Sequence, residues 1–426
     1  MPNLKGVNGH NPQNVPSDEE LAESLWKYLR QDFSREDELQ ALRSDHNYHI
    51  GLSSLRNIKI RLGIPTRRTQ NLPLEVVTQA VMDEVANDPA QSHGPDYIKT
   101  QLRLKNMLVP RDCIRNIMIK HFPDGFDIRF PGKKGRRVAR VPLRSLGPYF
   151  EISADGHEKL APAALQMGGV GFSIYGFKDK FSDCILWLKV YPDVRTAGAG
   201  AHIFLDFAEQ LGYIPIQLTT DKGSEVGWIY AFMAALRAVY AADIDPTRFP
   251  FHVLIKSIHN TIIEGFWRHL KEKLGLNLKD FLLRGKHEHL FNPHNPNHEP
   301  LFYWIFAPLM QQALDEFCDW WNNHRVRHQH DKIMPSGHIP TQALEYPAMF
   351  AALDCRIQVP HKAIESLRAE VTREEGSKSY FQAWPGLTAE FNAYASRIYV
   401  DIGEPEMTMA TGWDVFVHMA VAMELQ

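Results

Sequence analysis

The fold is decided by residues 149–155, YFEISAD, in which apolar and polar side chains alternate. This period of two predicts a strand that carries Asp155 on the face opposite its apolar residues. Farther along, residues 213–221 (YIPIQLTTD) predict a second, apolar strand that stops at Asp221, where Gly223 indicates a turn. We therefore expect each of these two acids to lie where a regular element ends.

A predicted amphipathic helix at residues 260–274 carries a third acid, Glu264. Its core stripe follows helical spacing: Ile263, Phe266, Trp267, Leu270 and Leu274. The same spacing gives a polar face: Asn260, Glu264, Arg268 and Lys271. Two strands and one helix could therefore bring Asp155, Asp221 and Glu264 to one point. The basic side chains of Arg268 and Lys271 would lie one and two helical turns beyond Glu264.

Such a trio of acids has a recognisable chemistry. Carboxylates crowded together repel one another, which raises their pKa values unless cations neutralise them. Mg²⁺ prefers oxygen ligands and is often held by one or two carboxylates together with substrate phosphates. Two such ions about 4 Å apart can stabilise the attacking and the leaving oxygen of a phosphodiester displacement. The alternative is three ordinary surface acids, since the chain has 50 Asp and Glu residues.

Four blocks of this sequence resemble the signatures of the retroviral-integrase-like DDE transposases. They are DGHEK from Asp155, TDKGSE around Asp221, HN-x3-E-x2-WR-x2-K from His259 to Lys271, and residues 320–344. The resemblance covers about residues 149–345 and is strongest to integrase-core proteins of eukaryotic genomes that derive from mobile elements. Residues 161–169 read as an insertion, a loop within this core.

The resemblance implies the fold, the site and the partners. The fold would be α/β, an RNase H-like mixed sheet flanked by helices. Asp155, Asp221 and Glu264 would be the catalytic residues and would bind two Mg²⁺ or Mn²⁺ ions. Arg268 and Lys271 would face the DNA backbone. Double-stranded DNA, both element ends and target, is the implied partner, and the protein would act as a homo-oligomer on DNA.

The composition fits a globular protein of two or three domains, with 426 residues, 44% of them hydrophobic and 23% charged. The four cysteines form no CxxC pair, which argues against a disulfide scaffold and a Cys-rich zinc site. The net charge of −3 means that DNA contacts must come from local patches. The sequence has no apolar run of membrane-spanning length and no signal peptide, so we expect no membrane partner and a nuclear location.

After a disordered N-terminus (residues 1–17), residues 18–70 read as a first helix-turn-helix unit. Ser34 is its expected N-cap. A glycine turn precedes the second helix, SSLRNIKIRLGI, which leaves Arg56 and Lys59 outward, in the place of a recognition helix. A plain helical hairpin is the alternative interpretation.

Residues 71–130 read as a second unit of the same kind. Their spacing resembles the second helix-turn-helix of bipartite transposase DNA-binding regions, with Arg111 and Arg115 outward. Together with the N-terminal unit, this gives an all-α region before the sheet. Two such units in tandem make DNA binding a stronger prediction than either alone.

A basic linker is predicted at residues 131–148, where glycines and prolines argue for extended chain. Its cations include Lys133, Lys134, Arg136 and Arg137, and no acid lies among them. Such residues can neutralise phosphates independently of sequence, although a solvated linker or a nuclear-import patch is also possible. Near the third acid, His259 could orient a water or a phosphate or cap the helix, and Asn260 is the better N-cap candidate.

The rest of the chain is less informative. Residues 149–346 would form the catalytic core and residues 347–426 a small C-terminal region. In that region SRIYVDI and WDVFVHMA read as strand-like pieces beside segments with a helical pattern. The four histidines between His287 and His298 raise a zinc hypothesis, but no cysteine lies close, and the Asn and Pro between them indicate an exposed loop. Trp320 and Trp321 are expected in the core.

These observations predict a DDE-type polynucleotidyl transferase that catalyses Mg²⁺-dependent DNA cleavage and strand transfer in DNA integration. One alternative is a domesticated, catalytically inactive DNA-binding protein that keeps the fold. Another is an RNase H-like nuclease acting on RNA–DNA hybrids. The tandem helical units argue against the nuclease, because such modules read duplex DNA.

Overall fold

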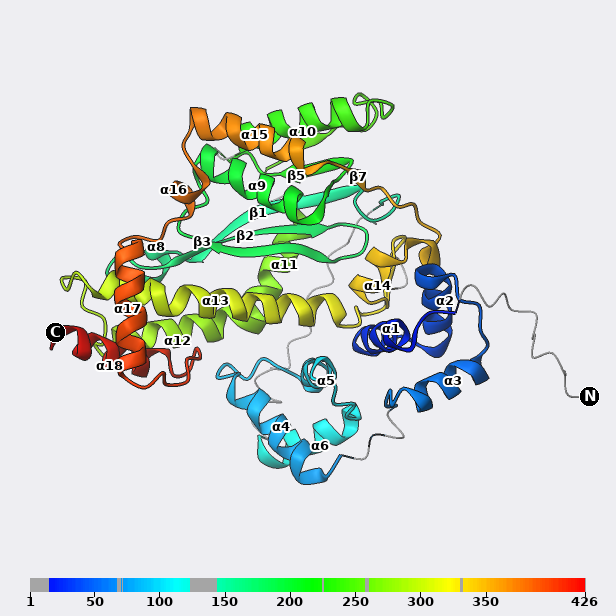
Figure 1. Cartoon of the computed structure of the whole chain (residues 1–426), viewed down its shortest axis with the longest axis horizontal. Coiled ribbons are helices and arrows are strands. Elements are labelled where there is room, and N and C mark those ends of the chain that lie inside the picture. Colours follow the sequence, from blue (N-terminus) through cyan, green and yellow to red (C-terminus); the bar gives the residue numbers. More distant parts are fainter. Residues whose placement is uncertain are drawn as a thin grey trace, which may run out of the picture.

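The structure, a computed structural model, describes residues 15–66, 70, 72–122, 144–223, 226–256, 260–329 and 332–425. Within them, five strands form a mixed sheet that lies between two layers of helices, and the helices of the N-terminal residues lie to one side (Figure 1). The predicted α/β fold with an N-terminal all-α region is confirmed. Most of the predicted disordered N-terminus and most of the basic linker lie outside the described residues.

The N-terminal helices form two groups of three, each with its own small apolar core. The first group is α1 (Asp18–Arg30), α2 (Arg35–His46) and α3 (Leu52–Arg61), and the second is α4 (Leu74–Ala86), α5 (Pro95–Leu104) and α6 (Arg111–His121). Ser34 caps α2 as predicted, since its hydroxyl accepts from the Asp37 N–H while the Asp37 carboxylate accepts from the Ser34 N–H.

The central sheet has the strand order β3-β2-β1-β5-β6. Its strands are β1 (Glu151–Leu160), β2 (Phe172–Asp179), β3 (Ile185–Tyr191), β5 (Gln217–Thr220) and β6 (His252–Leu254). The first three pair antiparallel, whereas β5 pairs parallel to β1 and to β6. The carboxyl ends of β1's first half and of β5 therefore lie at the same edge.

Helices cover both faces of this sheet (Figure 1). On one face lie α9 (Ala197–Leu211), α10 (Val226–Tyr240) and α15 (His361–Glu374), which pack on the β1 side chains Ile152 and Ala154. On the other lie α11 (Thr261–Leu270), α12 (Leu276–His287), α13 (His298–Asn323), α17 (Ala389–Asp401) and α18 (Gly412–Glu424). Trp320 and Trp321 of α13 are buried there, as expected. Asp155 belongs to the α11 face, because it alternates with Ala154 along the strand.

Several short elements complete the chain. They are α8 (Pro162–Leu165), β4 (Tyr213–Ile214), the π-helix η3 (Lys271–Gly275), α14 (Pro340–Glu345), the 3-10 helix η4 (Pro347–Phe350), β7 (Ile357–Gln358) and α16 (Lys378–Gln382). No helix in the described part of the chain is long and apolar enough to cross a membrane.

Four predictions about these elements are wrong in part. The strand expected at residues 213–221 is interrupted, because Pro215 has no N–H for a ladder; β4 pairs with β7 in a separate two-stranded sheet, and only β5 enters the central one. The strand with Asp155 continues to Leu160, so this acid lies mid-strand. The loop expected at residues 161–169 contains α8. The strand-like pieces near the C-terminus are the helices α17 and α18.

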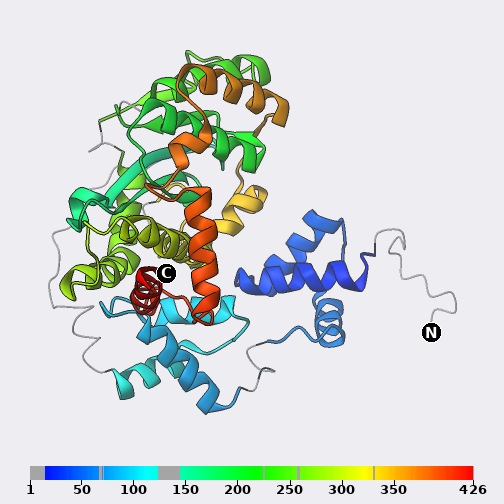
Figure 2. The same cartoon turned by 60° about the vertical axis from the view of Figure 1, so that its left-hand side comes forward.

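The two N-terminal groups contact different parts of the core (Figure 2). In the first group, the Lys27 ammonium lies 2.8 Å from a Glu345 carboxylate oxygen, and the Tyr346 hydroxyl donates to Asp45 at 2.8 Å. The second group docks through the loop between α4 and α5. In addition, Tyr97 of α5 packs on Trp320 of α13, with 4.4 Å between ring centroids.

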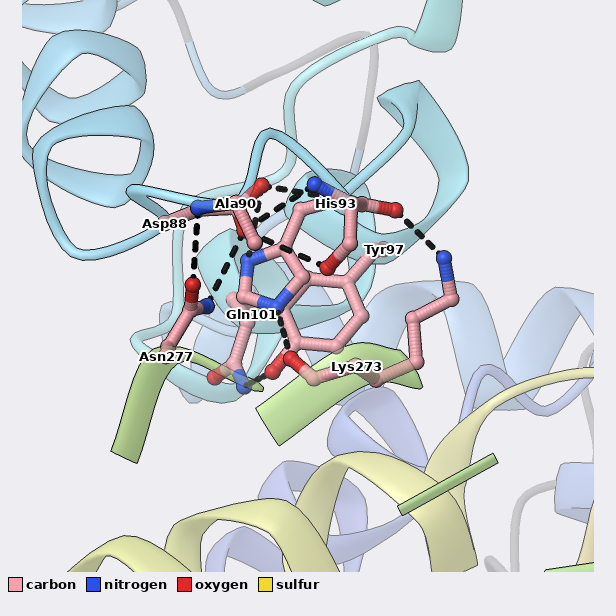
Figure 3. Close-up of polar contacts among 8 residues, drawn as sticks. Asp88, Ala90, His93, Tyr97, Gln101, Lys273 and Asn277 are labelled. Carbon is pink, nitrogen blue, oxygen red and sulfur yellow. Dashed lines mark hydrogen bonds and ion pairs between the residues drawn. The ribbon is translucent and has the colours of Figure 1, made fainter. Parts of the chain in front are cut away.

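Figure 3 shows this second attachment. Asn277 of α12 donates to the Asp88 carboxylate at 3.0 Å and accepts from the Ala90 N–H at 2.8 Å. The His93 ring lies 2.7 Å from the Lys273 carbonyl through its Nε2 and stacks on Tyr97 with 3.6 Å between centroids. The second group of helices therefore contacts η3 and α12, the continuation of the helix that carries Glu264.

Candidate active site

Asp155 and Asp221 come from neighbouring parallel strands. β1 and β5 pair Glu151 with Gln217, and the pairs continue in the same register to Ser153 with Thr219. Continuing that register puts Asp155 beside Asp221, directly beyond the end of β5. The Asp221 carboxylate accepts from the Gly223 N–H at 3.2 Å, which forms the turn expected there.

Helix α11 faces these two acids from the other side of the edge. Near its start, the Asn260 amide donates to the Ala154 carbonyl at 3.4 Å. Seven residues later, the Trp267 indole N–H donates to Asp155 Oδ2 at 2.9 Å. Glu264 lies between these two contacts at helical spacing and therefore points toward the same edge. The sheet and the helix thus direct all three predicted acids to one region.

The electrostatics of Asp155 reflect these neighbours. Burial raises the pKa of its carboxyl to about 7. The Trp267 hydrogen bond opposes this rise in pKa, whereas the like charges of Asp221 and Glu264 add to it. Asp155 and Asp221 are both half-buried, whereas Glu264 is exposed to solvent. A cation between the three would remove the repulsion.

The site has oxygen donors that suit a divalent cation, but they are not gathered around one point. As the side chains stand, no group of three His, Cys, Asp or Glu residues in the described ranges could hold a metal ion. The donor set nevertheless suits a hard cation: carboxylate oxygens, and the Asn260 amide oxygen, which is buried and has no hydrogen-bond partner in the structure. The predicted pair of ions stays a prediction. The zinc hypothesis for the histidines between His287 and His298, which the sequence did not favour, finds no group of three such ligands among the described residues. His298 itself is buried at the start of α13, and its Nδ1 accepts from the Asn292 N–H at 3.0 Å.

Trp267 has a role in the site that the sequence did not indicate, because its helical spacing marked it only as core. A glycine in β2 makes its approach possible. Gly176 pairs with Asp155 across the β1–β2 ladder, and a Cβ at Gly176 would lie 2.8 Å from the Trp267 ring. Beside them, the His157 ring stacks on Trp267 at 4.8 Å. The spacing of three residues between Glu264 and Trp267 is the signal that could have suggested this position.

Asn260 differs from its prediction in two ways. It occupies the N-cap position of α11, but its side chain makes no capping hydrogen bond. It is only 2% exposed, so it lies beneath the surface on which DNA was expected to contact it. Its contact with the Ala154 carbonyl fixes the start of α11 against β1 instead.

The basic side chains predicted to contact DNA differ in whether they form ion pairs with other residues. Arg268, Lys271, Arg56 and Arg115 are exposed, and none of them forms an ion pair with a described residue. Arg111 is also exposed and pairs with Asp96 at 2.8 Å.

The expectation that Lys59 points outward is wrong. Its ammonium lies 2.6 Å from a carboxylate oxygen of the buried Glu38, and its side chain is 14% exposed. Glu38 of α2 needs a partner because a buried, unpaired carboxylate is costly. The other predicted contacts, Lys133, Lys134, Arg136, Arg137 and His259, lie outside the described residues.

Comparisons with known proteins add to this geometry. A family model described as an integrase core domain matches residues 155–342, a span that begins at Asp155 and includes Asp221 and Glu264. Among solved structures, the chain is similar to one in the cryo-EM structure of the simian T-cell lymphotropic virus intasome in complex with PP2A regulatory subunit B56 gamma. The two are 15% identical with a TM-score of 0.29, and the match covers 61% of this chain and 78% of that chain. No curated protein matches.

Proposed function

Because residues 155–342 form an integrase-like catalytic core, we propose that the chain is a DDE-type polynucleotidyl transferase that cleaves DNA and joins its strands. One observation carries the proposal: a half-buried aspartate whose carboxyl pKa is raised to about 7, with Asp221 and Glu264 both near enough to add to that rise. Perturbed acids gathered at one place are typical of catalytic sites.

The integrase core family typically uses divalent metal ions. Asp155, Asp221 and Glu264 would hold two Mg²⁺ or Mn²⁺ ions, which supply positive charge for the attacking and leaving oxygens of the phosphodiester. The chain's own part is positioning. Trp267 orients the Asp155 carboxylate, and Arg268 and Lys271 hold the DNA backbone near it. Positioning and charge neutralisation account for most of the catalysis of phosphoryl transfer. The nucleophile is a water or a DNA 3′-hydroxyl.

We further propose how the parts divide this work. Residues 18–70 and 71–130 bind duplex DNA, at element ends and target, and the basic segment 131–148 contacts phosphates. Residues 149–346 do the chemistry. Residues 347–426 support both faces of this core, with α15 packed on α9 and with α17 and α18 packed on α13. The exposed Arg56 and Arg115 support a DNA-binding role of the helical groups. The active form would be a homo-oligomer assembled on DNA in the nucleus.

The second candidate is a domesticated DNA-binding protein that keeps the fold without activity. It is favoured by the lack, among the described residues, of an acid cluster already closed around a metal position. This candidate predicts DNA binding without cleavage at any metal concentration.

The substitution Glu264→Gln separates the two candidates. It removes one charge from the acid trio and leaves the helix intact, so we expect unchanged DNA affinity and a loss of Mg²⁺-dependent strand transfer of at least about 100-fold. Glu272→Gln is the matched control, because Glu272 is also exposed and lies on the same continuous helix. DNA binding and Mg²⁺-dependent strand transfer are both measured on the same labelled duplex. Full strand transfer by Glu264→Gln would rule out the mechanism.

A further inference from the structure

A pocket of about 400 Å³ opens beside the candidate active site, where the second half of β1 meets α8, η3, α12 and α13. Its volume is typical of sites that take small organic groups, about 300–1,000 Å³. Apolar side chains form its floor: Leu160, Ile174, Leu270, Leu278 and Leu314, all of them buried. The half-exposed Leu276 lies at its edge.

The polar part of the lining is cationic. Lys159, Lys271 and Lys279 line the pocket, and no acid does. None of these ammonium groups forms an ion pair or a hydrogen bond with another described residue. Each of the three lysines has an acid beside it in the sequence, but Glu158 is held by Arg195 at 2.5 Å, and Glu272 and Asp280 are exposed and do not line the pocket. Three uncompensated positive charges around an apolar floor are complementary to a ligand that joins a flat apolar body to anionic groups.

The pocket lies next to the acid trio. His157, one of its lining residues, stacks on Trp267, whose indole holds Asp155. Lys271 lies seven residues beyond Glu264, which is about 10 Å along a helix. Single strands rise about 3.4 Å per nucleotide in B-DNA, so a strand passing Glu264 reaches the pocket within about three nucleotides.

The π-turn of η3 shapes this wall of the pocket. The Leu276 N–H bonds to the Lys271 carbonyl, five residues earlier. The extra residue in that turn widens it, and both Lys271 and Leu276 line the pocket. Single π-turns inserted in α-helices are frequent at functional sites.

We propose that this pocket receives one unpaired nucleobase of the DNA strand that passes the acid trio, and that its three lysines hold the adjoining phosphates. The inference rests on the proposed function and specifies the form of its substrate: a duplex that is locally unpaired next to the reacting bond. A paired base is covered on both faces by its neighbours and cannot enter. Burial of an unpaired base against the leucines offsets the cost of unstacking it.

The test compares three fluorescein-labelled probes by anisotropy, with Ca²⁺ in place of Mg²⁺. They are a blunt 20-base-pair duplex, the same duplex with a three-nucleotide unpaired 3′ tail, and that tailed duplex with abasic sites in the tail. We expect the full-length protein to bind the tailed duplex about tenfold more tightly than either other probe, as a stacked base would give.

Two pocket variants and one control accompany the probes. Leu276→Glu puts a negative charge at the pocket edge, and because Leu276 is 44% exposed the change leaves the core intact. Lys279→Gln removes one of the cations. Both should bind all three probes equally, with blunt-duplex affinity within about twofold of the unmodified protein. Val400→Glu, at a 58% exposed position of α17, should keep the tenfold preference. Melting temperatures check that all three variants fold.

The possible outcomes test the pocket assignment separately from the proposed function on which it rests. If the protein cleaves DNA but shows no preference for the tail, the pocket assignment is wrong and the function stands. If the abasic tail binds as well as the natural one, only phosphates are recognised, and the nucleobase site is refuted. A third outcome is that an acidic peptide binds, that the tailed duplex gains nothing from its tail, and that Leu276→Glu weakens the binding of the peptide. The occupant of the pocket is then a protein. If no DNA is bound or cleaved, both proposals fail together.

Discussion

Asp155 is the residue on which the candidate site depends most. It is half-buried, burial raises the pKa of its carboxyl to about 7, and the hydrogen bond from Trp267 opposes that rise. The sequence indicated its face of the strand, because alternation alone fixes that. It did not indicate Trp267 as a partner, since a hydrogen bond between residues 112 positions apart depends on where α11 lies against β2.

The indole hydrogen bond should therefore control the pH dependence of the reaction. A donor to the ionised carboxylate lowers its pKa, so Trp267→Phe raises the pKa of Asp155 and leaves it protonated at higher pH. We expect the acid limb of the rate profile to move up by about one pH unit, because hydrogen bonds to charged groups contribute about 1.5–3 kcal/mol.

The measurement is the rate of Mg²⁺-dependent cleavage between pH 5 and 9. Trp304→Phe is the control, because the Trp304 indole donates to Asn392 on the far side of α13, away from the acids. An acid limb at the same pH in Trp267→Phe and in the unmodified protein would show that Asp155 does not govern the reaction.

At the scale of elements, the helix after the third acid is the clearest difference between prediction and structure. The sequence predicted a helix at residues 260–274, whose apolar stripe ends at Leu274. The chain instead passes through the π-turn of η3 and continues as α12 to His287. An i to i+5 bond has no side-chain pattern of its own, so it could not be read from the sequence.

The C-terminal helices show a second limit. SRIYVDI is rich in β-branched and aromatic residues, which favour strands in isolation. The spacing of Ala395 and Ile398, and of Trp413, Phe416 and Ala420, nevertheless gives helices whose apolar faces pack in the core with α13. Packing against a partner outweighs local preference, and the partner is invisible in a short segment.

The attachment of the second helical group to α12 gives a prediction at this scale. Asn277→Leu leaves the buried Asp88 carboxylate and the Ala90 N–H each without one partner, which costs about 1–3 kcal/mol. We expect faster amide hydrogen exchange in α4 to α6 and unchanged exchange in the central sheet, because these helices have their own core.

The exposed Asn392→Leu serves as the comparison and should alter neither region. Uniform acceleration throughout the protein in Asn277→Leu would mean that the loop supports the whole fold. No acceleration at all would mean that its hydrogen bonds do not hold the two parts together.

At the scale of the whole molecule, the sequence predicted the order of the parts but not how they contact one another. The first helical group lies against Glu345 and Tyr346, more than 300 positions away in the chain, and the second against η3 and α12. These contacts join a few polar groups and single aromatic rings, such as Phe33 with Tyr346 and Tyr97 with Trp320, and they have no periodic signature. The overall net charge of −3 likewise gave no indication of which exposed cations are left unpaired.

Paired and unpaired cations should respond differently to substitution. Arg115→Ala should weaken binding of a generic duplex and reduce the slope of log affinity against log salt by about one, the loss of a single phosphate contact. Lys59→Met should leave that slope unchanged and lower the unfolding free energy, because it leaves the buried Glu38 carboxylate without its ion-pair partner. Titrations between 50 and 200 mM salt and urea unfolding distinguish the two. Equal slopes for the two variants would contradict the placement of these cations.

The central claim is that Asp155, Asp221 and Glu264 act together on one metal site, and Mn²⁺ binding measured by titration calorimetry on the DNA-bound protein tests it most directly. We predict that Asp155→Asn, Asp221→Asn and Glu264→Gln each weaken Mn²⁺ binding by at least about tenfold, while Glu272→Gln has no effect. If the three variants bind Mn²⁺ as the unmodified protein does, the acids do not share a metal and the core is not an active transferase.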